Sequence, residues 1–368
     1  MVDAQLVARA KALIDDLAKT PRFAGTPDEA LARARCRAEL ERAGFACREI
    51  SFEYSQWLAR WGSPLLAFVL GALIIFLGRL GLAGEPLAAT AVLFGMFVVL
   101  FLTFASVRKG WILAFPWSRA VATNLECRRG NPTLWLLAHL DSKSQTVPML
   151  PRIAGSVALY LAGLLTAFGS LAFLIWGDVA APAVFAAQVL AAFGAVMVGL
   201  CFVGNRSPGG VDNASGVAAV LLAAQSPDSS ETLGVLITSG EELGLAGASA
   251  WAANAEATLV ILNCDTIDEA GRFRCMYSYR EPVRVTIAAE RQAKRLGMEL
   301  KIGRLIPGIM ADSMVFANRV SWSAITLSRG TLGTLARIHT RRDNSSVLSG
   351  NGAAQASVLL SALTKELS

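Results

Sequence analysis

The chain opens with the hydrophobic pattern of a soluble α/β protein. Apolar residues recur with helical periodicity over residues 3–19 and 27–43, and residues 45–54 have the character of a strand. Thr26 is placed to cap the second helix, and Gly44 is placed to end it. Because the first helix is amphipathic and has no long apolar core, we interpret it as part of the folded protein rather than as a signal peptide.

Four long apolar runs without a charged residue interrupt this pattern. They cover residues 61–78, 86–107, 153–177 and 179–205, in two pairs joined by short connectors. Each run approaches or exceeds the roughly 18–20 apolar residues that span a bilayer, so we expect two transmembrane hairpins. Buried core helices are the alternative interpretation, but soluble core helices of this length rarely lack charge on every face.

Strand and helix patterns alternate through the rest of the chain. The expected strands are residues 121–127, 133–138, 233–238, 258–264 and 323–327, and the expected helices are residues 213–225, 245–254, 283–296 and 352–367. This alternation predicts an α/β fold with a mostly parallel mixed sheet flanked by helices on both faces, into which the two hairpins are inserted. The expected sheet domain is residues 1–60, 108–152 and 206–368, and the hairpins are residues 61–107 and 153–205.

Composition agrees with a protein that contacts the lipid bilayer. The hydrophobic content is 54%, the charged content 17% and the mean hydropathy +0.48, all on the apolar side of ordinary soluble proteins. The net charge of +6 is not concentrated in a Lys/Arg-rich run with interleaved aromatic residues. We therefore expect no nucleic-acid partner and attribute the basic residues to the ends of membrane spans.

The distribution of basic residues predicts the orientation. The connectors within the hairpins contain only Arg79, whereas seven basic residues adjoin the soluble segments: Arg60, Arg108, Lys109, Arg119, Lys143, Arg152 and Arg206. The positive-inside rule then places the soluble domain in the cytoplasm. The six cysteines show no paired spacing, and we interpret them as reduced and structural, as in a reducing compartment.

Candidate chemistry centres on the only two histidines of the chain. His139 ends an apolar strand, with Asp141 two residues on, and His339 lies near the C-terminus. Acidic residues also follow the other expected strands or open helices, namely Asp212, Glu241, Glu242, Asp265 and Asp343. A structural His–Asp pair, a helix cap and a solvated Glu–Glu pair would explain these residues one by one. An unpaired carboxylate after a buried strand is costly, however, so the set favours a divalent metal site over a nucleophilic triad.

These stretches, in this order, resemble the co-catalytic di-zinc aminopeptidase family, the group of bacterial leucyl aminopeptidase, glutamate carboxypeptidase and glutaminyl cyclase. The segment Arg-Phe-Ala-Gly-Thr-Pro at residues 22–27 resembles that family's N-terminal Arg…Gly-Thr-Pro segment. The chain departs from the family in its two hairpins. It also departs at residues 311–316, where Ser313 stands in place of the usual histidine.

The resemblance implies two zinc ions held by five residues. Asp212 would bridge the ions, His139 and Asp265 would complete one, and Glu242 and His339 would complete the other.

The resemblance also implies roles for two further carboxylates. Glu241 would be the general base, and Asp141 would orient His139. Asp343 is placed to support His339.

The implied activity is that of a zinc metallopeptidase in the membrane, and the resemblance favours an aminopeptidase that hydrolyses a peptide substrate. The alternatives are a carboxypeptidase, a single-metal aminoacyl cyclase, and a non-catalytic membrane scaffold or binding subunit. Retention of Glu241 and all five ligands argues against loss of catalysis or of a metal. Because the strand that carries His139 emerges between the hairpins, we expect the active site to open near the bilayer surface.

Overall fold

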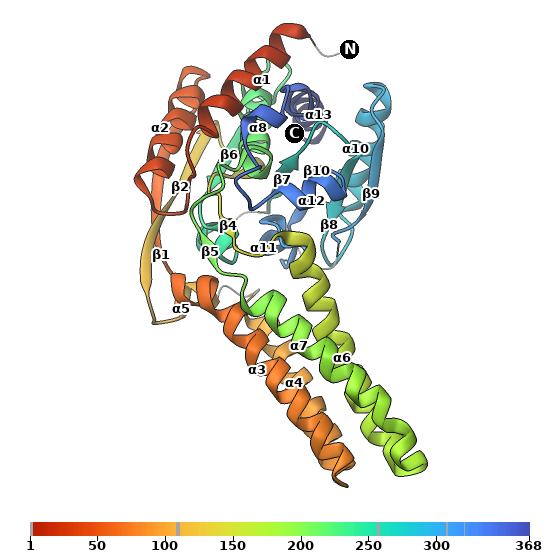
Figure 1. Ribbon diagram of the computed structural model, residues 1–368. Helices are drawn as coiled ribbons and strands as arrows, with labels where there is room; N and C mark the ends of the chain where they lie inside the picture. Colours follow the sequence, from red (N-terminus) through yellow and green to blue (C-terminus); the bar gives the residue numbers. More distant parts are fainter. Residues whose placement is uncertain (1–2, 108–110, 256–257, 307, 320) are drawn as a thin grey trace. The chain divides into compact units, whose positions relative to one another are not determined.

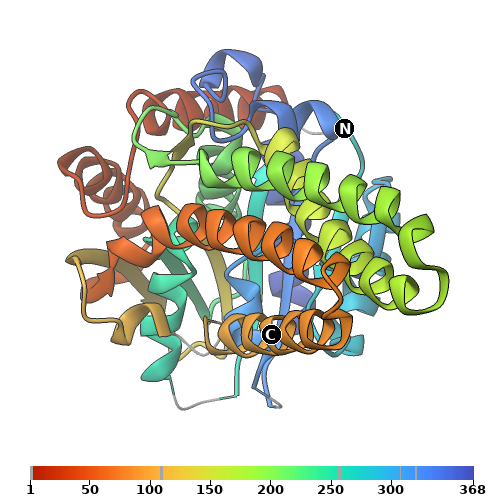
Figure 2. The same cartoon turned by 60° about the horizontal axis from the view of Figure 1, so that its bottom comes forward.

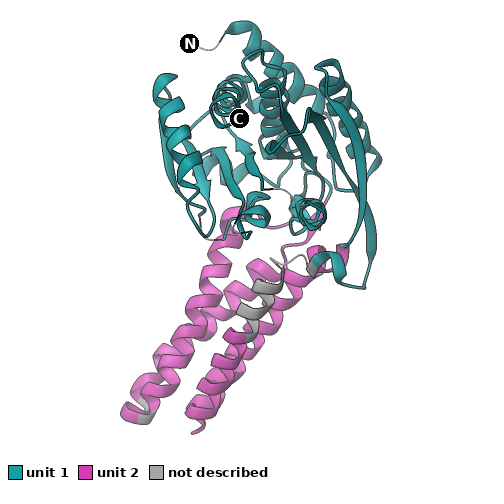
Figure 3. Ribbon diagram, turned by 180° about the vertical axis from the view of Figure 1, so that it is seen from behind, with its two compact units in different colours: residues 1–55, 112–144, 205–368 teal, residues 56–111, 145–204 magenta. Residues whose placement is uncertain are grey.

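The computed structural model describes residues 3–107, 111–255, 258–306, 308–319 and 321–368 (Figure 1). The chain forms two compact units, each assembled from separate stretches of sequence (Figure 3). Unit 1 consists of Met1–Ser55, Ile112–Ser144 and Asn205–Ser368, and unit 2 consists of Gln56–Trp111 and Gln145–Gly204.

Unit 1 is built on an eight-stranded sheet among the residues that the structure describes. The strand order is β1-β2-β6-β3-β7-β10-β8-β9. The strands are β1 (Ala46–Ser55), β2 (Arg119–Arg129), β3 (Leu134–His139), β6 (Leu233–Thr238), β7 (Val260–Ile267), β8 (Phe273–Tyr277), β9 (Leu300–Arg304) and β10 (Ser323–Arg329). The central strands β6, β3, β7 and β10 are parallel. On one side β2 pairs antiparallel with β6 and β1 antiparallel with β2; on the other, β8 pairs antiparallel with β10 and β9 parallel with β8. The predicted α/β fold with a mixed, mostly parallel sheet is therefore confirmed, although β8 and β9 were not expected.

Helices cover both faces of this sheet, which explains why every residue of β3 and β6 is buried. One face carries α8 (Ser215–Gln225) and α13 (Asn351–Leu367), and the other carries α9 (Ala246–Ala253) and α11 (Ser313–Ala317). The remaining helices of unit 1 are α1 (Ala4–Leu17), α2 (Pro27–Arg42), α5 (Trp111–Ala114), α10 (Val283–Arg295) and α12 (Leu332–Arg337).

The core on the α9 and α11 face is aromatic. The Trp135 ring on β3 lies 4.9 Å from that of Trp251, which in turn lies 5.8 Å from that of Phe316. Burial of these large side chains anchors the central strands, whose carboxyl ends bear the candidate site.

Unit 2 consists of apolar helices that pack against one another (Figures 1 and 2). They are α3 (Ser63–Leu82), α4 (Pro86–Val107), α6 (Met149–Trp176) and α7 (Ala181–Gly199). Among the described residues, three segments are long and apolar enough to cross a membrane: Leu58–Leu82, Met149–Phe173 and Ala181–Gly199. The second predicted span, residues 86–107, corresponds to α4, of which the described apolar part is Pro86–Val98.

The packing within unit 2 is of the kind found between helices in lipid. Small residues stand where helices meet: a Cβ atom on Gly194 would lie 2.6 Å from the carbonyl oxygen of Gly155. Large apolar side chains point outward instead, with Phe94, Phe168 and Ile175 each about 70% exposed. So much exposed apolar surface would be costly in water and is favourable against lipid.

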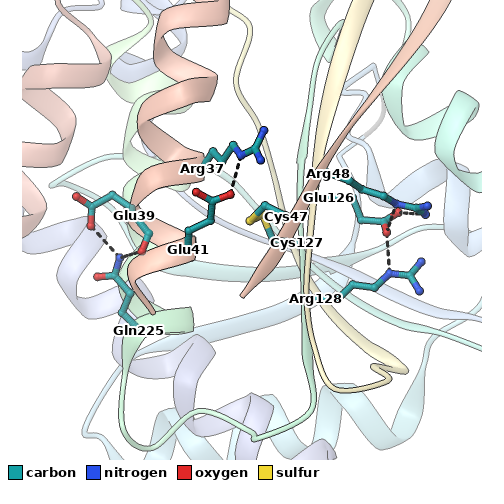
Figure 4. Close-up of a disulfide and its surroundings, with 9 residues drawn as sticks. All are labelled: Arg37, Glu39, Glu41, Cys47, Arg48, Glu126, Cys127, Arg128 and Gln225. Atoms are coloured by element: carbon teal, nitrogen blue, oxygen red, sulfur yellow. Dashed lines mark hydrogen bonds and ion pairs between the residues drawn. A yellow bond between two sulfur atoms is a disulfide. The ribbon is translucent and has the colours of Figure 1, made fainter. Parts of the chain in front are cut away.

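Cys47 and Cys127 form a disulfide between β1 and β2 (Figure 4). The two cysteines are directly paired in the antiparallel ladder although 80 residues separate them in sequence, because the first apolar hairpin lies between their strands. The interpretation of all six cysteines as reduced is therefore wrong for this pair. The other four, Cys36, Cys201, Cys264 and Cys275, are free and buried.

The disulfide should stabilise unit 1 against thermal unfolding. Closing a loop of this length restricts the unfolded chain, an effect typically worth about 2–4 kcal/mol. We expect dithiothreitol to lower the melting temperature of the purified wild-type protein. Cys47→Ser should melt at the lower temperature with or without the reductant. Six alkylatable thiols in the unreduced, denatured wild type would contradict the pairing.

Candidate metal centre

The candidate site lies at the carboxyl ends of three neighbouring parallel strands. His139 is the last residue of β3, and β6 and β7 flank that strand. Glu241 and Glu242 begin a 3₁₀ turn directly after β6, and Asp265 lies near the end of β7. Parallel strands bring residues that are distant in sequence to one edge of the sheet, which is where such folds place their chemistry.

Asp212 lies between the two histidines. Its Oδ1 is 3.1 Å from Nε2 of His139, and its Oδ2 is 3.1 Å from Nε2 of His339. A carboxylate that presents one oxygen to each of two imidazoles has the geometry of a bridging ligand. The structure thus brings together His139, Asp212 and Asp265 as one group of possible ligands, and Asp212, Glu242 and His339 as the other.

The first group is anchored through His139. Its Nε2 lies 3.5 Å from Oδ1 of Asp265, and its Nδ1 lies 3.0 Å from the main-chain oxygen of Asp141. The Asp141 carboxylate was expected to orient the imidazole, but its nearer oxygen is 3.7 Å from Nδ1. Instead, it accepts hydrogen bonds from the backbone N–H groups of Glu241 (3.1 Å) and Glu242 (3.2 Å). Asp141 therefore supports the first group through its main chain and shapes the Glu241–Glu242 turn through its side chain.

The second group contains buried ligand atoms without hydrogen bonds. Glu242 Oε1 and His339 Nε2 lie 3.0 Å apart, yet neither makes a well-aligned hydrogen bond within the described part of the chain. His339 follows α12 and has a φ of +60°, in the left-handed region that only a few per cent of non-glycine residues adopt. Buried polar atoms converging in this way fit a cation between them.

Asp343 holds the loop that carries Asp212. Its two carboxylate oxygens accept hydrogen bonds from the backbone N–H groups of Val211 (2.6 Å) and Asp212 (3.2 Å). Burial, together with the nearby Asp212 carboxylate, raises the pKa of Asp343 to about 7. Asp343 was expected beside His339, and the hydrogen bonds described here connect it to the Asp212 loop instead.

The electrostatics of the site follow from burying several carboxylates together. Burial raises the pKa of Glu241 well above its ordinary range, with His139 opposing the effect and the nearby carboxylates Glu242 and Asp265 adding to it. Burial also works against ionisation of Asp212, but its close contacts with the two histidines outweigh this effect and lower the pKa of that carboxyl. Concentrated negative charge of this kind would be relieved by divalent cations.

The donor set fits zinc. Each group combines one imidazole nitrogen with two carboxylate oxygens, and the ligand atoms of each group lie within 4.8 Å of one another. Three protein ligands that leave a position open for water or substrate are typical of catalytic zinc. The residues present therefore suit an ion in each group.

A buried arginine, to which sequence reasoning gave no role of its own, connects the loops around the site. Arg22 is fully buried, and its guanidinium donates to the carbonyl oxygens of Leu17, Leu140, Pro208 and Gly209. These contacts join the loop after β3 to the loop before Asp212. The arginine of the Arg…Gly-Thr-Pro segment thus positions both metal-binding loops.

Glu29 is a second buried group that sequence reasoning missed. Its carboxylate accepts hydrogen bonds from the Gly25 N–H (2.7 Å) and from the Ser239 hydroxyl, two residues before Glu241. Burial and the charge of Asp141 raise the pKa of Glu29 to about 8. The signal available in the sequence was Thr26-Pro-Asp-Glu29, the spacing of a helix-capping box.

Ser313, the residue that departs from the family pattern, has a structural role rather than a chemical one. It is buried, and its hydroxyl lies 2.7 Å from that of Thr326 on β10.

Comparison with known proteins gives one family match. The sequence model of peptidase family M28 matches residues 182–364, about half of the chain. The match includes Asp212, Glu241, Glu242, Asp265 and His339 and excludes His139. A search of curated proteins gave no match.

Solved structures share the fold over nearly the whole chain. A zinc aminopeptidase from Bacillus subtilis has a TM-score of 0.57 at 13% identity, covering 98% of this chain and 95% of its own. An aminopeptidase from Aneurinibacillus sp. strain AM-1 has a TM-score of 0.56 at 13% identity, covering 97% and 92%. Glutaminyl cyclase from Porphyromonas gingivalis has a TM-score of 0.56 at 14% identity, covering 97% of both chains.

Replacing Glu29 should change how stability depends on pH. Because the pKa of Glu29 is about 8 in the folded protein and near 4.5 in the unfolded chain, the folded state retains a proton that the unfolded state loses between these values. Its contribution to stability is therefore complete below about pH 4.5 and is lost as the pH rises to about 8. We therefore expect the melting temperature of Glu29→Gln minus that of wild type to increase as the pH is raised from 5 to 8.

The control for this comparison is Glu290→Gln, which removes a carboxylate from an exposed position on α10. Its difference from wild type should not change with pH. A difference between Glu29→Gln and wild type that stays constant from pH 5 to 8 would contradict a raised pKa at Glu29.

Proposed function

Because the chain is a zinc metallopeptidase related to peptidase family M28, we propose that it is an aminopeptidase that uses two zinc ions and is integral to the membrane. The observation that carries the two-zinc proposal is the position of Asp212, whose two oxygens each face a different histidine at 3.1 Å. The His139 group and the His339 group would each hold one ion.

Two zinc ions held this way would lower the pKa of a shared water and polarise the scissile carbonyl. Glu241 would act as the general base. Its pKa, raised by burial and by neighbouring carboxylates, suits a group that accepts a proton and passes it to the leaving amine. The hydrogen bonds from the Glu241 and Glu242 N–H groups to Asp141 fix the turn on which both glutamates stand, which lets adjacent residues serve as base and ligand.

The course of the chain supports membrane-proximal substrates. Unit 1 is interrupted after Ser55 and after Ser144. Ser55 pairs with Arg119 at one end of the β1–β2 ladder, and this end lies toward the carboxyl end of β6. Ser144 is three residues beyond Asp141. These two interruptions thus lie at the edge of the sheet that bears the site. We propose that peptides held at the bilayer surface are the substrates.

Replacing Glu241 should separate catalysis from metal binding. Glu241→Gln removes the base while keeping the shape of the side chain, and we expect peptide hydrolysis to fall by about 10²–10⁴-fold with zinc content unchanged. Asp212→Ala removes the shared ligand and should lose both zinc and activity. The measurements are hydrolysis of a peptide library and elemental analysis of the purified protein.

Asp228→Ala is the matched control, because it removes an exposed carboxylate paired with Lys365. It should retain wild-type zinc content and activity. Unchanged hydrolysis in both Glu241→Gln and Asp212→Ala would refute the assignment. Binding of only one zinc ion per wild-type chain in excess zinc, with no second site in any variant, would favour a single-metal activity such as aminoacyl cyclisation.

For the orientation, we propose a cytoplasmic unit 1, from the basic residues at its junctions with the apolar helices. Among these basic residues, Arg119 pairs with Glu53 and Lys143 with Glu242 within unit 1, and Arg108 and Lys109 lie outside the described residues. The Cys47–Cys127 disulfide is the observation that counts against this orientation, since disulfides persist mainly in oxidising compartments.

A reporter fused after Ser368 should test this orientation. We expect a C-terminal fluorescent protein to be active in the cytoplasm and a C-terminal alkaline phosphatase to be inactive. The reverse pattern would place the catalytic unit on the outer side and would agree with the disulfide.

A further inference from the structure

Lys143 is held in place beside the candidate site by hydrogen bonds of its neighbours and by burial. The residues on either side of it are anchored: Ser142 exchanges hydrogen bonds with Arg22, and the Ser144 hydroxyl accepts one from the Arg206 N–H at 3.0 Å. The Lys143 side chain itself is only 12% exposed. These restraints distinguish it from a mobile surface lysine.

The Lys143 ammonium group is directed at Glu242. Its Nζ lies 2.7 Å from Glu242 Oε2 and donates to the main-chain oxygen of the same residue at 3.1 Å. The other carboxylate oxygen, Oε1, lies 3.0 Å from His339 Nε2. One oxygen of Glu242 is thus paired with the lysine, and the other faces the metal ligands.

The other half of the site has no such cation. Among the described residues, no lysine or arginine forms an ion pair with Asp212 or Asp265. Asp265 has His139 and the Thr266 hydroxyl as neighbours instead. The two ligand groups therefore share Asp212 but differ by one buried positive charge.

We propose that Lys143 restricts Glu242 to binding metal through one oxygen and makes the ion at Glu242 and His339 the weaker of the two. This inference rests on the proposed two-zinc function. The ammonium group competes with a cation for the Glu242 carboxylate and repels an ion placed beside it. Lys143 acts through Glu242, so it is a positioning residue. It gives the site one tightly bound and one exchangeable ion.

Glu242 should remain in place without Lys143. The Glu242 N–H donates to the Asp141 carboxylate at 3.2 Å, so the turn has an anchor that does not involve the lysine. Removing the charge should therefore free the second oxygen for the metal rather than displace the ligand. Residues that contact metal ligands commonly change affinity by about 10–100-fold, and here the sign is a gain.

The test is a zinc titration of the metal-free full-length chain in detergent, in competition with a chelator of known affinity. We expect wild type to bind two ions with dissociation constants at least about 10-fold apart. Lys143→Met removes the charge and keeps the length of the side chain, and it should tighten the weaker ion by about 10-fold or more. The tighter ion should change by less than about twofold. Lys143→Arg should behave as wild type.

Further variants complete the design. Lys365→Met, at an exposed lysine, is the control for loss of a positive charge and should change neither constant. His339→Ala should abolish binding of the weaker ion, and His139→Ala should abolish binding of the tighter ion. The melting temperature of each metal-free variant shows whether it is folded.

The outcomes separate this proposal from the proposed function. Two ions whose affinities are unaffected or weakened by Lys143→Met would overturn the role of Lys143 and leave the two-zinc site standing. One ion in wild type and a second in Lys143→Met would support the role of Lys143. No zinc, or one ion in both proteins, would overturn both proposals.

Discussion

The structure of the site depends on where a single buried carboxylate is held. Asp212 has one oxygen 3.1 Å from each histidine, and it keeps this position because Asp343 binds the backbone of its loop. Arg22 fastens the start of that loop to the loop after β3. A carboxylate buried in this way is costly unless cations or hydrogen bonds compensate it, so the surrounding groups are arranged around its charge.

Burial of several acids at one edge of the sheet explains the other features of the site. Asp141 is compensated by two backbone N–H groups, Glu242 by Lys143, and Asp212 by the two histidines. Burial and the neighbouring carboxylates raise the pKa of Glu241, which suits it to proton transfer. Structural support and catalytic potential thus arise from the same concentration of charge.

Much of this arrangement could be predicted from the sequence because apolar strands end directly at the ligands. The run from Leu134 to His139 and the run from Leu233 to Thr238 identify two central strands and the residues that follow them. The short strands β8 and β9 were missed because polar and basic residues break their pattern. Pairing of Cys47 with Cys127 depends on strand register across an 80-residue separation, which spacing does not reveal. Lys143 was counted among the charges flanking a membrane span, because only the fold brings it to Glu242.

The central claim is that Asp212 joins two zinc ions in one site. Anomalous X-ray diffraction at the zinc edge, on crystals of the zinc-loaded wild-type protein, tests it most directly. The account predicts two anomalous peaks roughly 3.5–4 Å apart, one beside His139 and Asp265 and the other beside Glu242 and His339, with Asp212 between them. A single peak, or peaks that do not contact Asp212, would contradict it.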